Sequence, residues 1–422
     1  MKKINLIGLE MDCYTETLEN GLEVFMVPYD NKKNYFISFA TRFGSDVLEF
    51  TDENNNTFIP PKGIAHFLEH KMFEQASGED PFTFFSKSGT ESNASTSYDN
   101  TGYICYGTKE FGTNLRFLLH FVMSPYFTDQ NVEKEKGIIA EEIKMYDDMK
   151  EFALEMKIRE CIYKDHSRRY DIAGTVPEIE KITKEDLYNC YNNFYTPNNM
   201  FVLIVGNFKK EEALNIIKEE IGYKKPKTLP KIKKQEEQPK VNEKEGIIKS
   251  NIEIPKLAFA LKIPTKNLKL KDLELDLYLS MLTTILFGSS SAFRDRVRQE
   301  KLLSGMYTEW EQTADYRVFY LMASTVNPDE LLKEIEKELT NIKITEKTMN
   351  RIKKVWISSE IRMIDSIDAT VNNLYDDIIK YKKIIPNKID RIKAMDIQTL
   401  KDLIKEIDFK NTSVVKMLKD NN

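Results

Sequence analysis

Two histidines lie four residues apart in the segment GIAHFLEHKMFEQ, and the whole chain contains only four. On a helix, His66 and His70 are rotated by about 40° from each other, so both imidazoles can reach one metal ion. Glu69 lies about 60° to the other side of His66, which places its carboxylate on the same face. Because neutral imidazole is a common zinc ligand, the segment predicts a zinc site with an unliganded carboxylate beside it.

A third ligand has to come from elsewhere, and the segment VEKEKGIIAEEIKMYDD offers several glutamates. On a helical wheel Glu142 and Glu135 lie about 20° apart, whereas Glu133 and Glu141 point well away from them. The same side of the predicted helix carries four apolar residues: Ile138, Ile139, Met145 and Tyr146. A carboxylate on an apolar face is costly to bury unless it is paired, hydrogen-bonded or bound to metal. Glu142 and Glu135 are therefore the candidates, and the alternative is that both reach solvent from a helix edge.

The motif HFLEH resembles the inverted zinc motif HxxEH of the pitrilysin/insulysin metallopeptidases, a group that includes the mitochondrial processing peptidases. That family has a glutamate as third ligand roughly seventy to eighty residues later, preceded by another acidic residue. Here Glu142 lies 142 − 70 = 72 residues after His70, and Glu135 lies seven before Glu142. The resemblance implies Zn²⁺ held by His66, His70 and Glu142. It also implies catalytic roles for Glu69, as the base that takes a proton from water, and for Glu135, which fixes the ligands or tunes the charge of the site.

Two further segments bear on the substrate. ESNASTSYDNTGY resembles the edge strand of the family, so we expect Asn93 and Ala94 to bind an extended peptide through main-chain hydrogen bonds. The alternative is an ordinary Ser/Asn turn before a strand. The family also places an arginine and a tyrosine seven residues apart in its second half. The nearest candidates here, Arg298 and Tyr307, are nine apart, so a partner chain could supply these substrate contacts instead.

The elements that must hold these residues alternate between helices and strands. Residues 63–73 and 129–148 have helical apolar spacing and carry the candidate metal ligands. Residues 35–42 and 201–205 are short, rich in β-branched and aromatic residues, and predict strands. The candidate site is therefore expected to sit on helices packed against a sheet.

Residues 224–246 contain three prolines, many charges and few apolar side chains, which predicts an exposed linker. The 422 residues then divide into a zinc-bearing domain at 1–223, this linker, and a second domain at 247–422. The helix and strand that end the second domain resemble those that end the first, which indicates a diverged duplication or a chance similarity. We expect an α+β fold of two related domains, each a mostly antiparallel sheet with helices on one face. No histidine follows His166, so the second domain lacks zinc ligands.

Composition excludes some classes of protein. A net charge of −5 without a long block of one sign argues against a nucleic-acid partner. No apolar run approaches the roughly 20 residues of a membrane span. The four cysteines lack CxxC spacing and disulfide-scaffold density, which indicates reduced thiols and a cytoplasmic location.

The resemblance implies a zinc-dependent endopeptidase that hydrolyses peptides or unfolded protein segments. Its two-domain length resembles that of the family members that must pair to close a chamber. We therefore expect a dimer, with a related chain that lacks the zinc motif as the preferred partner. The alternative is a non-catalytic assembly subunit, or a maturation subunit with a single substrate, in a heterodimeric complex.

Overall fold

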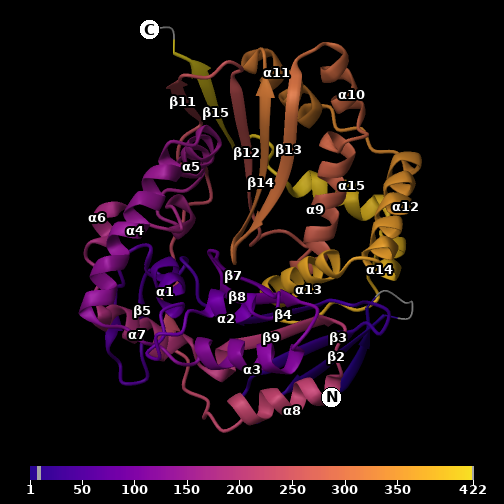
Figure 1. Ribbon diagram of the computed structural model, residues 1–422. Helices are drawn as coiled ribbons and strands as arrows, with labels where there is room; N and C mark the ends of the chain where they lie inside the picture. The colour runs from indigo at the N-terminus through magenta and orange to yellow at the C-terminus, as the bar shows by residue number, and fades with distance from the viewer. Residues whose placement is uncertain (7–10, 421–422) are drawn as a thin grey trace. The chain divides into compact units, whose positions relative to one another are not determined.

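The computed structural model describes residues 1–6 and 11–420, which form two compact units (Figure 1). The first unit comprises Met1–Met145, Asp171–Lys234 and Glu360–Lys388. The second unit comprises Tyr146–Tyr170, Gln235–Ser359 and Ile389–Asn422. The units therefore do not coincide with the predicted domains 1–223 and 247–422. Residues 146–170 belong to the second unit, and residues 360–388 belong to the first.

The first unit is built on a seven-stranded sheet with the order β1-β2-β3-β9-β4-β8-β7. Its strands are β1 (Lys2–Asn5), β2 (Asp12–Thr17), β3 (Glu23–Pro28), β4 (Tyr35–Thr41), β7 (Glu91–Thr96), β8 (Thr101–Gly107) and β9 (Met200–Gly206). β3 and β9 run parallel, and the other neighbours run antiparallel. The strand β9, with the sequence MFVLIVG, is buried along its whole length. Such a continuous apolar run is typical of a strand covered on both faces.

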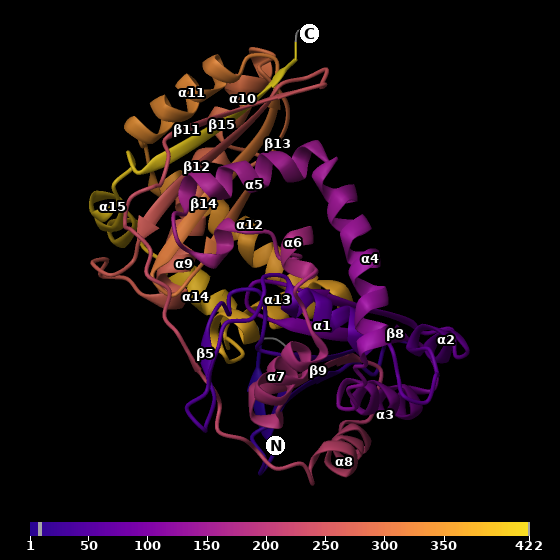
Figure 2. The ribbon, with the colours of Figure 1, turned by 90° about the vertical axis from the view of Figure 1, so that its left-hand side faces the viewer.

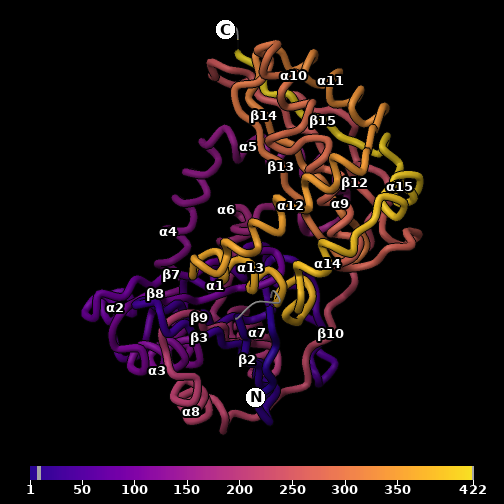
Figure 3. Tube along the Cα trace, turned by 90° about the vertical axis from the view of Figure 1, so that its right-hand side faces the viewer, coloured from indigo at the N-terminus to yellow at the C-terminus, as the bar shows by residue number. Residues whose placement is uncertain are grey.

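Helices cover both faces of this sheet, and alternate residues of β9 point to opposite sides. Val202 and Ile204 join the core that includes α1, α3, α7 and α8. Phe201 instead faces Tyr375 of α13, with 5.4 Å between ring centroids; Figure 3 shows α13 on the side of the sheet away from α3 and α8. The helices of this unit are α1 (Ile64–Met72), α2 (Pro81–Ser86), α3 (Phe111–Val122), α4 (Asp129–Asp147), α6 (Val176–Ile179), α7 (Lys184–Phe194), η2 (Pro197–Asn199), α8 (Lys210–Ile221) and α13 (Ile367–Tyr381).

The second unit has a five-stranded sheet with the order β11-β15-β12-β14-β13. Its strands are β11 (Glu245–Ser250), β12 (Lys256–Pro264), β13 (Leu303–Gln312), β14 (Tyr316–Thr325) and β15 (Thr412–Lys419). β11 and β15 run parallel, and the other pairs run antiparallel. The sheet is again covered on both faces, by α11 on one and α5 on the other (Figure 2).

Alternation along β12 explains these two layers. Phe259 and Leu261 pack in the core that includes α9 and α11, whereas Ala258 and Ala260 pack against Leu154 of α5. The helices of this unit are α5 (Lys150–Ile162), η1 (Ser167–Arg169), α9 (Asp272–Phe287), α10 (Ala292–Gln299), α11 (Pro328–Thr340), α12 (Glu346–Met363), α14 (Lys388–Ala394) and α15 (Ile397–Glu406). The α+β prediction is confirmed, with helices on two faces of each sheet where one was expected.

Part of the predicted linker, residues 224–246, pairs with a strand of the first unit. Most of its residues are exposed, but β10 (Lys231–Ile232) pairs with β5 (Phe50–Thr51), which in turn pairs with β6 (Thr57–Phe58). The Lys233 ammonium also lies 2.7 Å from the Glu49 carboxylate. No helix among the described residues is long and apolar enough to span a bilayer.

Candidate metal centre

The helix α1 carries both histidines, and its start depends on a glycine. Gly63 precedes the helix with φ of 88°, in the left-handed region that L side chains avoid. A Cβ at this position would lie 2.2 Å from the carbonyl oxygen of Ala173. Only glycine meets both requirements, because the turn needs a positive φ and the backbones approach closely. From there α1 buries Phe67 and Leu68 in the core, which leaves His66 and His70 on the half-buried side.

Three donor atoms from α1 and α4 converge on one point. Nε2 of His70 lies 3.4 Å from Oε2 of Glu142, and Nε2 of His66 lies 3.8 Å from Oε1 of Glu142. Ligand atoms of all three residues lie within 4.8 Å of one another. Tetrahedral zinc with bonds of about 2.0–2.1 Å separates its ligand atoms by about 3.3 Å. The donor set and its spacing therefore fit a divalent ion such as zinc.

The helix α4 departs from the wheel prediction in two of its apolar residues. Ile139 and Ile143 are buried, but Ile138 and Met145 are 48% and 55% exposed. The prediction that Ile138 and Met145 belong to a buried stripe is therefore wrong. The buried face of α4 includes Glu135 together with Val132, Ile139 and Ile143, and the half-buried Glu142 lies at its edge. Glu133 and Glu141 are exposed, as expected.

Glu69 is placed beside the three donors and is not one of them. It is 8% exposed, and Oε2 accepts a hydrogen bond of 2.7 Å from the hydroxyl of Thr96. Burial raises the pKa of Glu69, and the charge of Glu142 acts in the same direction, while the Thr96 hydrogen bond opposes them. The contact between Thr96 and Glu69 was not predicted from the sequence, although Thr96 lies two residues after Ala94 and so shares its face of β7.

Glu135 contacts a histidine and not the centre of the donor set. Its Oε1 lies 3.1 Å from Nδ1 of His70, and its Oε2 accepts a hydrogen bond from Lys71. Burial opposes ionisation, but these two partners lower the pKa of Glu135 overall. Lys71 was also missed from the sequence, since a lysine beside the motif is ordinarily expected to reach solvent.

The two histidines differ in their surroundings. Burial, together with the charge of His70, lowers the pKa of His66 to about 4, so this imidazole is neutral near pH 7. For His70, burial also acts to lower the pKa, but the hydrogen bond and charge of Glu135 outweigh it and raise the pKa overall. Nδ1 of His66 is buried and has no hydrogen-bond partner within the described residues.

The predicted substrate residues lie in both units. Asn93 and Ala94 are in β7, at the end of the strand order of the first sheet, as the edge-strand prediction requires. The N–H of Ala94 donates a hydrogen bond of 2.8 Å to the side-chain oxygen of Asn93. Arg298 is exposed on α10, and Tyr307 is 54% exposed on β13, both in the second unit. Their roles stay predictions.

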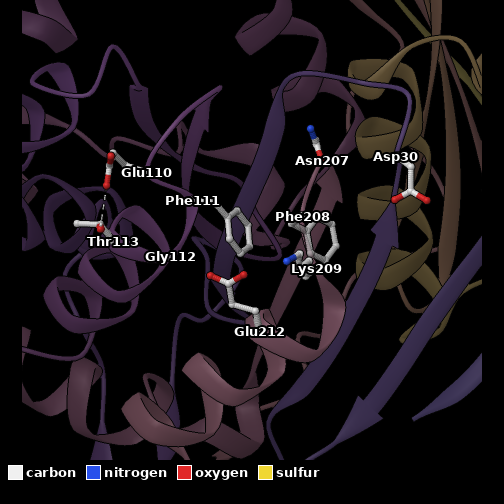
Figure 4. A pocket seen from close by; sticks show the side chains of 9 residues that line it. All are labelled: Asp30, Glu110, Phe111, Gly112, Thr113, Asn207, Phe208, Lys209 and Glu212. Carbon is white, nitrogen blue, oxygen red and sulfur yellow. Dashed lines mark hydrogen bonds between the residues drawn. The ribbon is translucent and has the colours of Figure 1, made fainter.

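A surface pocket lies apart from these donors, at the first turns of α3 and α8 (Figure 4). The residues around it are Asp30, Glu110, Phe111, Gly112, Thr113, Asn207, Phe208, Lys209 and Glu212. Three carboxylates and one ammonium line it, and none of the candidate ligands does. His120 lines a neighbouring pocket on α3 and takes no part in the donor set.

Comparisons with known proteins agree with this geometry. A family model described as Insulinase (Peptidase family M16) matches residues 54–176, and one described as Peptidase M16 inactive domain matches residues 181–355. The chain is 35% identical over 413 residues to the uncharacterized zinc protease YmfH of Bacillus subtilis (strain 168), covering 96% of this chain and 95% of that protein. It is 25% identical over 378 residues to the zinc protease PqqE of Helicobacter pylori, covering 86% and 82%.

A solved structure is similar over the full length. The crystal structure of an M16-like peptidase from Alicyclobacillus acidocaldarius superposes with a TM-score of 0.92 at 30% identity, covering 98% of this chain and 100% of that chain. The residues of the candidate centre on α1 and α4 fall inside the 54–176 match. The family expected from HFLEH is thereby confirmed, and this chain belongs to peptidase family M16, the insulinase family.

Proposed function

We propose that this chain is a zinc-dependent endopeptidase that hydrolyses peptides or unfolded protein segments. The observation that carries the proposal is the convergence of His66, His70 and Glu142 within 4.8 Å, with the Glu69 carboxylate beside them and outside the donor set. Hydrolysis needs both a metal site and a carboxylate able to exchange a proton near it. The zinc protease names of the relatives support the same reading.

Each residue of the centre has a separate task in this mechanism. Zinc held by His66, His70 and Glu142 would polarise the scissile carbonyl and lower the pKa of water toward about 7. Glu69 accepts the proton of the attacking water and returns it to the leaving amine. The raised pKa of Glu69 suits this exchange, because a buried carboxyl holds a proton more readily than an exposed one. Thr96 holds the carboxylate in place.

The strand β7 supports the proposed substrate class. An extended peptide that pairs with Asn93 and Ala94 would be bound through main-chain groups, which are the same for every sequence. Because Thr96 of this strand also contacts Glu69, a paired peptide would pass directly beside the base. Selection would therefore favour unfolded segments over a particular side-chain sequence.

The Glu69→Gln variant tests the proposal. It should bind zinc as the parent does, since Glu69 is not a ligand, and lose about 10²–10⁴-fold in kcat on an unfolded peptide. Zinc content by elemental analysis and quenched-peptide cleavage provide the two readouts. Glu141→Gln is the matched control, because this exposed glutamate of α4 pairs with Lys144 and lies outside the centre. Full activity of Glu69→Gln would refute the assigned role.

A paired assembly is the second part of the proposal. The second unit has no histidine after His166, and Arg298 and Tyr307 are both exposed, so contacts on the substrate could come from another chain. We expect the isolated chain to cleave slowly and to gain activity with a related chain that lacks HxxEH. The gain should persist in Arg298→Ala. Full activity of the isolated chain that is lost in Arg298→Ala or Tyr307→Phe would show a self-sufficient enzyme.

A non-catalytic or single-substrate subunit of such an assembly is the alternative function. It would bind zinc yet cleave no general peptide, with or without the related chain. A cytoplasmic location also belongs to the proposal, supported by four buried cysteines that are all unpaired. Titration of four thiols in the denatured, unreduced protein would agree with it, whereas intermolecular disulfides in the native protein would not.

A further inference from the structure

Lys71, the residue after the second histidine of HFLEH, is fully buried, with 0% of its side chain exposed. Burying an ammonium is costly unless groups of opposite charge surround it. Two glutamates do so: Glu74, three residues later, accepts a hydrogen bond from Nζ, and Oε2 of Glu135 on α4 lies 3.3 Å away. A lysine in the core of this centre therefore joins the two helices that carry the candidate metal ligands.

Glu135 connects this lysine to His70. Its Oε2 contacts Lys71, and its Oε1 lies 3.1 Å from Nδ1 of His70. The two oxygens of one carboxylate are held from two sides, so the carboxylate cannot rotate without losing one of these contacts. His66 provides the contrast, because its buried Nδ1 has no hydrogen-bond partner within the described residues.

We infer that Lys71 is a positioning residue of the metal centre. Its ammonium holds the Glu135 carboxylate against Nδ1 of His70, which keeps the proton on Nδ1 and directs Nε2 toward Glu142. This inference rests on the proposed zinc site. Carboxylates that hydrogen-bond a metal-ligating histidine fix its tautomer and orientation, and loss of such a partner weakens metal affinity or activity by about 10–100-fold. Lys71 acts one contact farther from the metal, through Glu135.

A purely structural role would be different: Lys71 would balance the buried charge of the glutamates, and its loss would affect folding alone. The two roles are separated by a readout at the metal. Co²⁺ replaces zinc in tetrahedral sites and absorbs visible light in a way that depends on ligand geometry. The visible spectrum of the Co²⁺-loaded chain and the zinc dissociation constant, measured against a chelator, report on the centre independently of hydrolysis.

The test compares Lys71→Met with a matched control. Methionine keeps the length of the side chain and removes its charge. We expect zinc to bind about 10-fold or more weakly, with a changed Co²⁺ spectrum. Lys136→Met is the control, since Lys136 follows Glu135 on α4 but pairs with Glu133 at 3.0 Å; its zinc affinity and spectrum should equal those of the parent.

The Glu135→Gln background keeps the inference testable should Lys71→Met fold poorly. There the carboxylate through which Lys71 acts is absent, so adding Lys71→Met should change zinc affinity and the Co²⁺ spectrum no further. An equal loss of affinity in both backgrounds would overturn the inference. Parent-like affinity and spectrum in a folded Lys71→Met single variant would overturn it as well.

The same experiments separate this inference from the proposed function. If the parent binds Co²⁺ and the Lys71 variants behave as expected, but no peptide is cleaved, the positioning role stands and the peptidase proposal fails. If the parent cleaves peptides while Lys71→Met binds zinc unchanged and shows an unchanged ratio of kcat to KM, the peptidase proposal stands and the positioning role fails.

Discussion

The two units share one plan and differ in what they place on it. The order β3-β9-β4-β8-β7 in the first sheet corresponds to β11-β15-β12-β14-β13 in the second, with the first pair parallel in each. In the first unit the chain forms α1 between β4 and β7, and at the corresponding place in the second unit, between β12 and β13, it forms α9. Where α1 carries HFLEH, α9 buries Leu275, Leu279 and Leu282. The shared plan therefore depends on apolar packing, and the metal-binding chemistry on a few polar substitutions.

Both units also bury charges, but with different results. In the second unit Glu311 accepts hydrogen bonds from Arg159 and from Tyr163, and the Arg168 guanidinium lies 3.7 Å away. Both oxygens of the Glu311 carboxylate therefore have hydrogen-bond partners within this cluster. In the first unit Nε2 of His66, Nε2 of His70 and the Glu142 carboxylate instead point at a common centre. Buried charged groups thus indicate a metal site only when their donor atoms point at a common centre and do not form hydrogen bonds with one another.

Replacing His70 should have the largest effect on zinc affinity and none on the stability of the second unit. His70→Ala removes a donor atom. Losing a residue that only hydrogen-bonds a metal ligand lowers metal affinity by up to about 100-fold, so losing the ligand itself should lower zinc affinity by more than that. Competition with a chelator measures it. The second unit should be unaffected, and this can be observed directly because both tryptophans, Trp310 and Trp356, belong to it. A shifted tryptophan unfolding midpoint would show that the units do not behave separately.

Replacing Glu311 should give the reverse result. Glu311→Gln removes the buried carboxylate that accepts hydrogen bonds from Arg159 and Tyr163, and removing one partner of a buried ion pair typically costs about 3–5 kcal/mol. Urea unfolding followed by tryptophan fluorescence checks the loss, and zinc affinity should match the parent. Glu330→Gln, which removes a partly exposed partner of Lys333, should change stability by less than about 0.5 kcal/mol. Weakened zinc binding in Glu311→Gln would contradict the separation of the two clusters.

Acid should weaken the second unit through the same residue. Although burial opposes ionisation, the charges of Arg159 and Arg168 lower the pKa of Glu311 from 4.5 to about 2. Its contribution is therefore complete above about pH 4.5 and is lost as the pH falls toward 2, a loss of the order of 3 kcal/mol. Urea midpoints at several pH values should fall less steeply in Glu311→Gln than in the parent. Equal slopes would remove Glu311 as the acid-sensitive group.

Much of the centre could be predicted because helical spacing is local. The pair His66 and His70 needs only a period of 3.6 residues to share a face. The wheel selected Glu135 and Glu142 but placed Ile138 on the buried side, because apolar residues alone do not show where a helix meets its neighbours. Lys71 escaped prediction for a related reason: its burial depends on Glu135 from another helix, a tertiary contact without a local signal.

The fold was predictable in class and less so in assembly. The apolar strands and the helix–strand ending of each half indicated two related α+β domains. Residues 146–170 and 360–388, however, pack in the unit formed mainly by the other half of the chain. An amphipathic helix such as α5 shows in its sequence that one face needs cover, but Leu154 and Ile158 could pack on either sheet. Each exchanged segment supplies a helix, α5 or α13, that covers the face of a sheet left open by the other helices of that unit.

Replacing Thr96 should have the smallest effect of these changes, and it tests whether β7 holds the Glu69 carboxylate. Thr96→Val keeps the shape of the side chain and removes the hydroxyl that donates 2.7 Å to Glu69. A hydrogen bond to a charged group contributes about 1.5–3 kcal/mol, so kcat should fall by roughly 10-fold or more. Thr96→Ser should restore most of the activity, because the donor returns. Ser95→Ala is the matched control on the exposed, opposite face of β7 and should leave kcat unchanged. Zinc content should stay constant throughout, since Glu69 and Thr96 lie outside the donor set; if Thr96→Val lost zinc, or kept full kcat, the edge strand would have no part in holding the base.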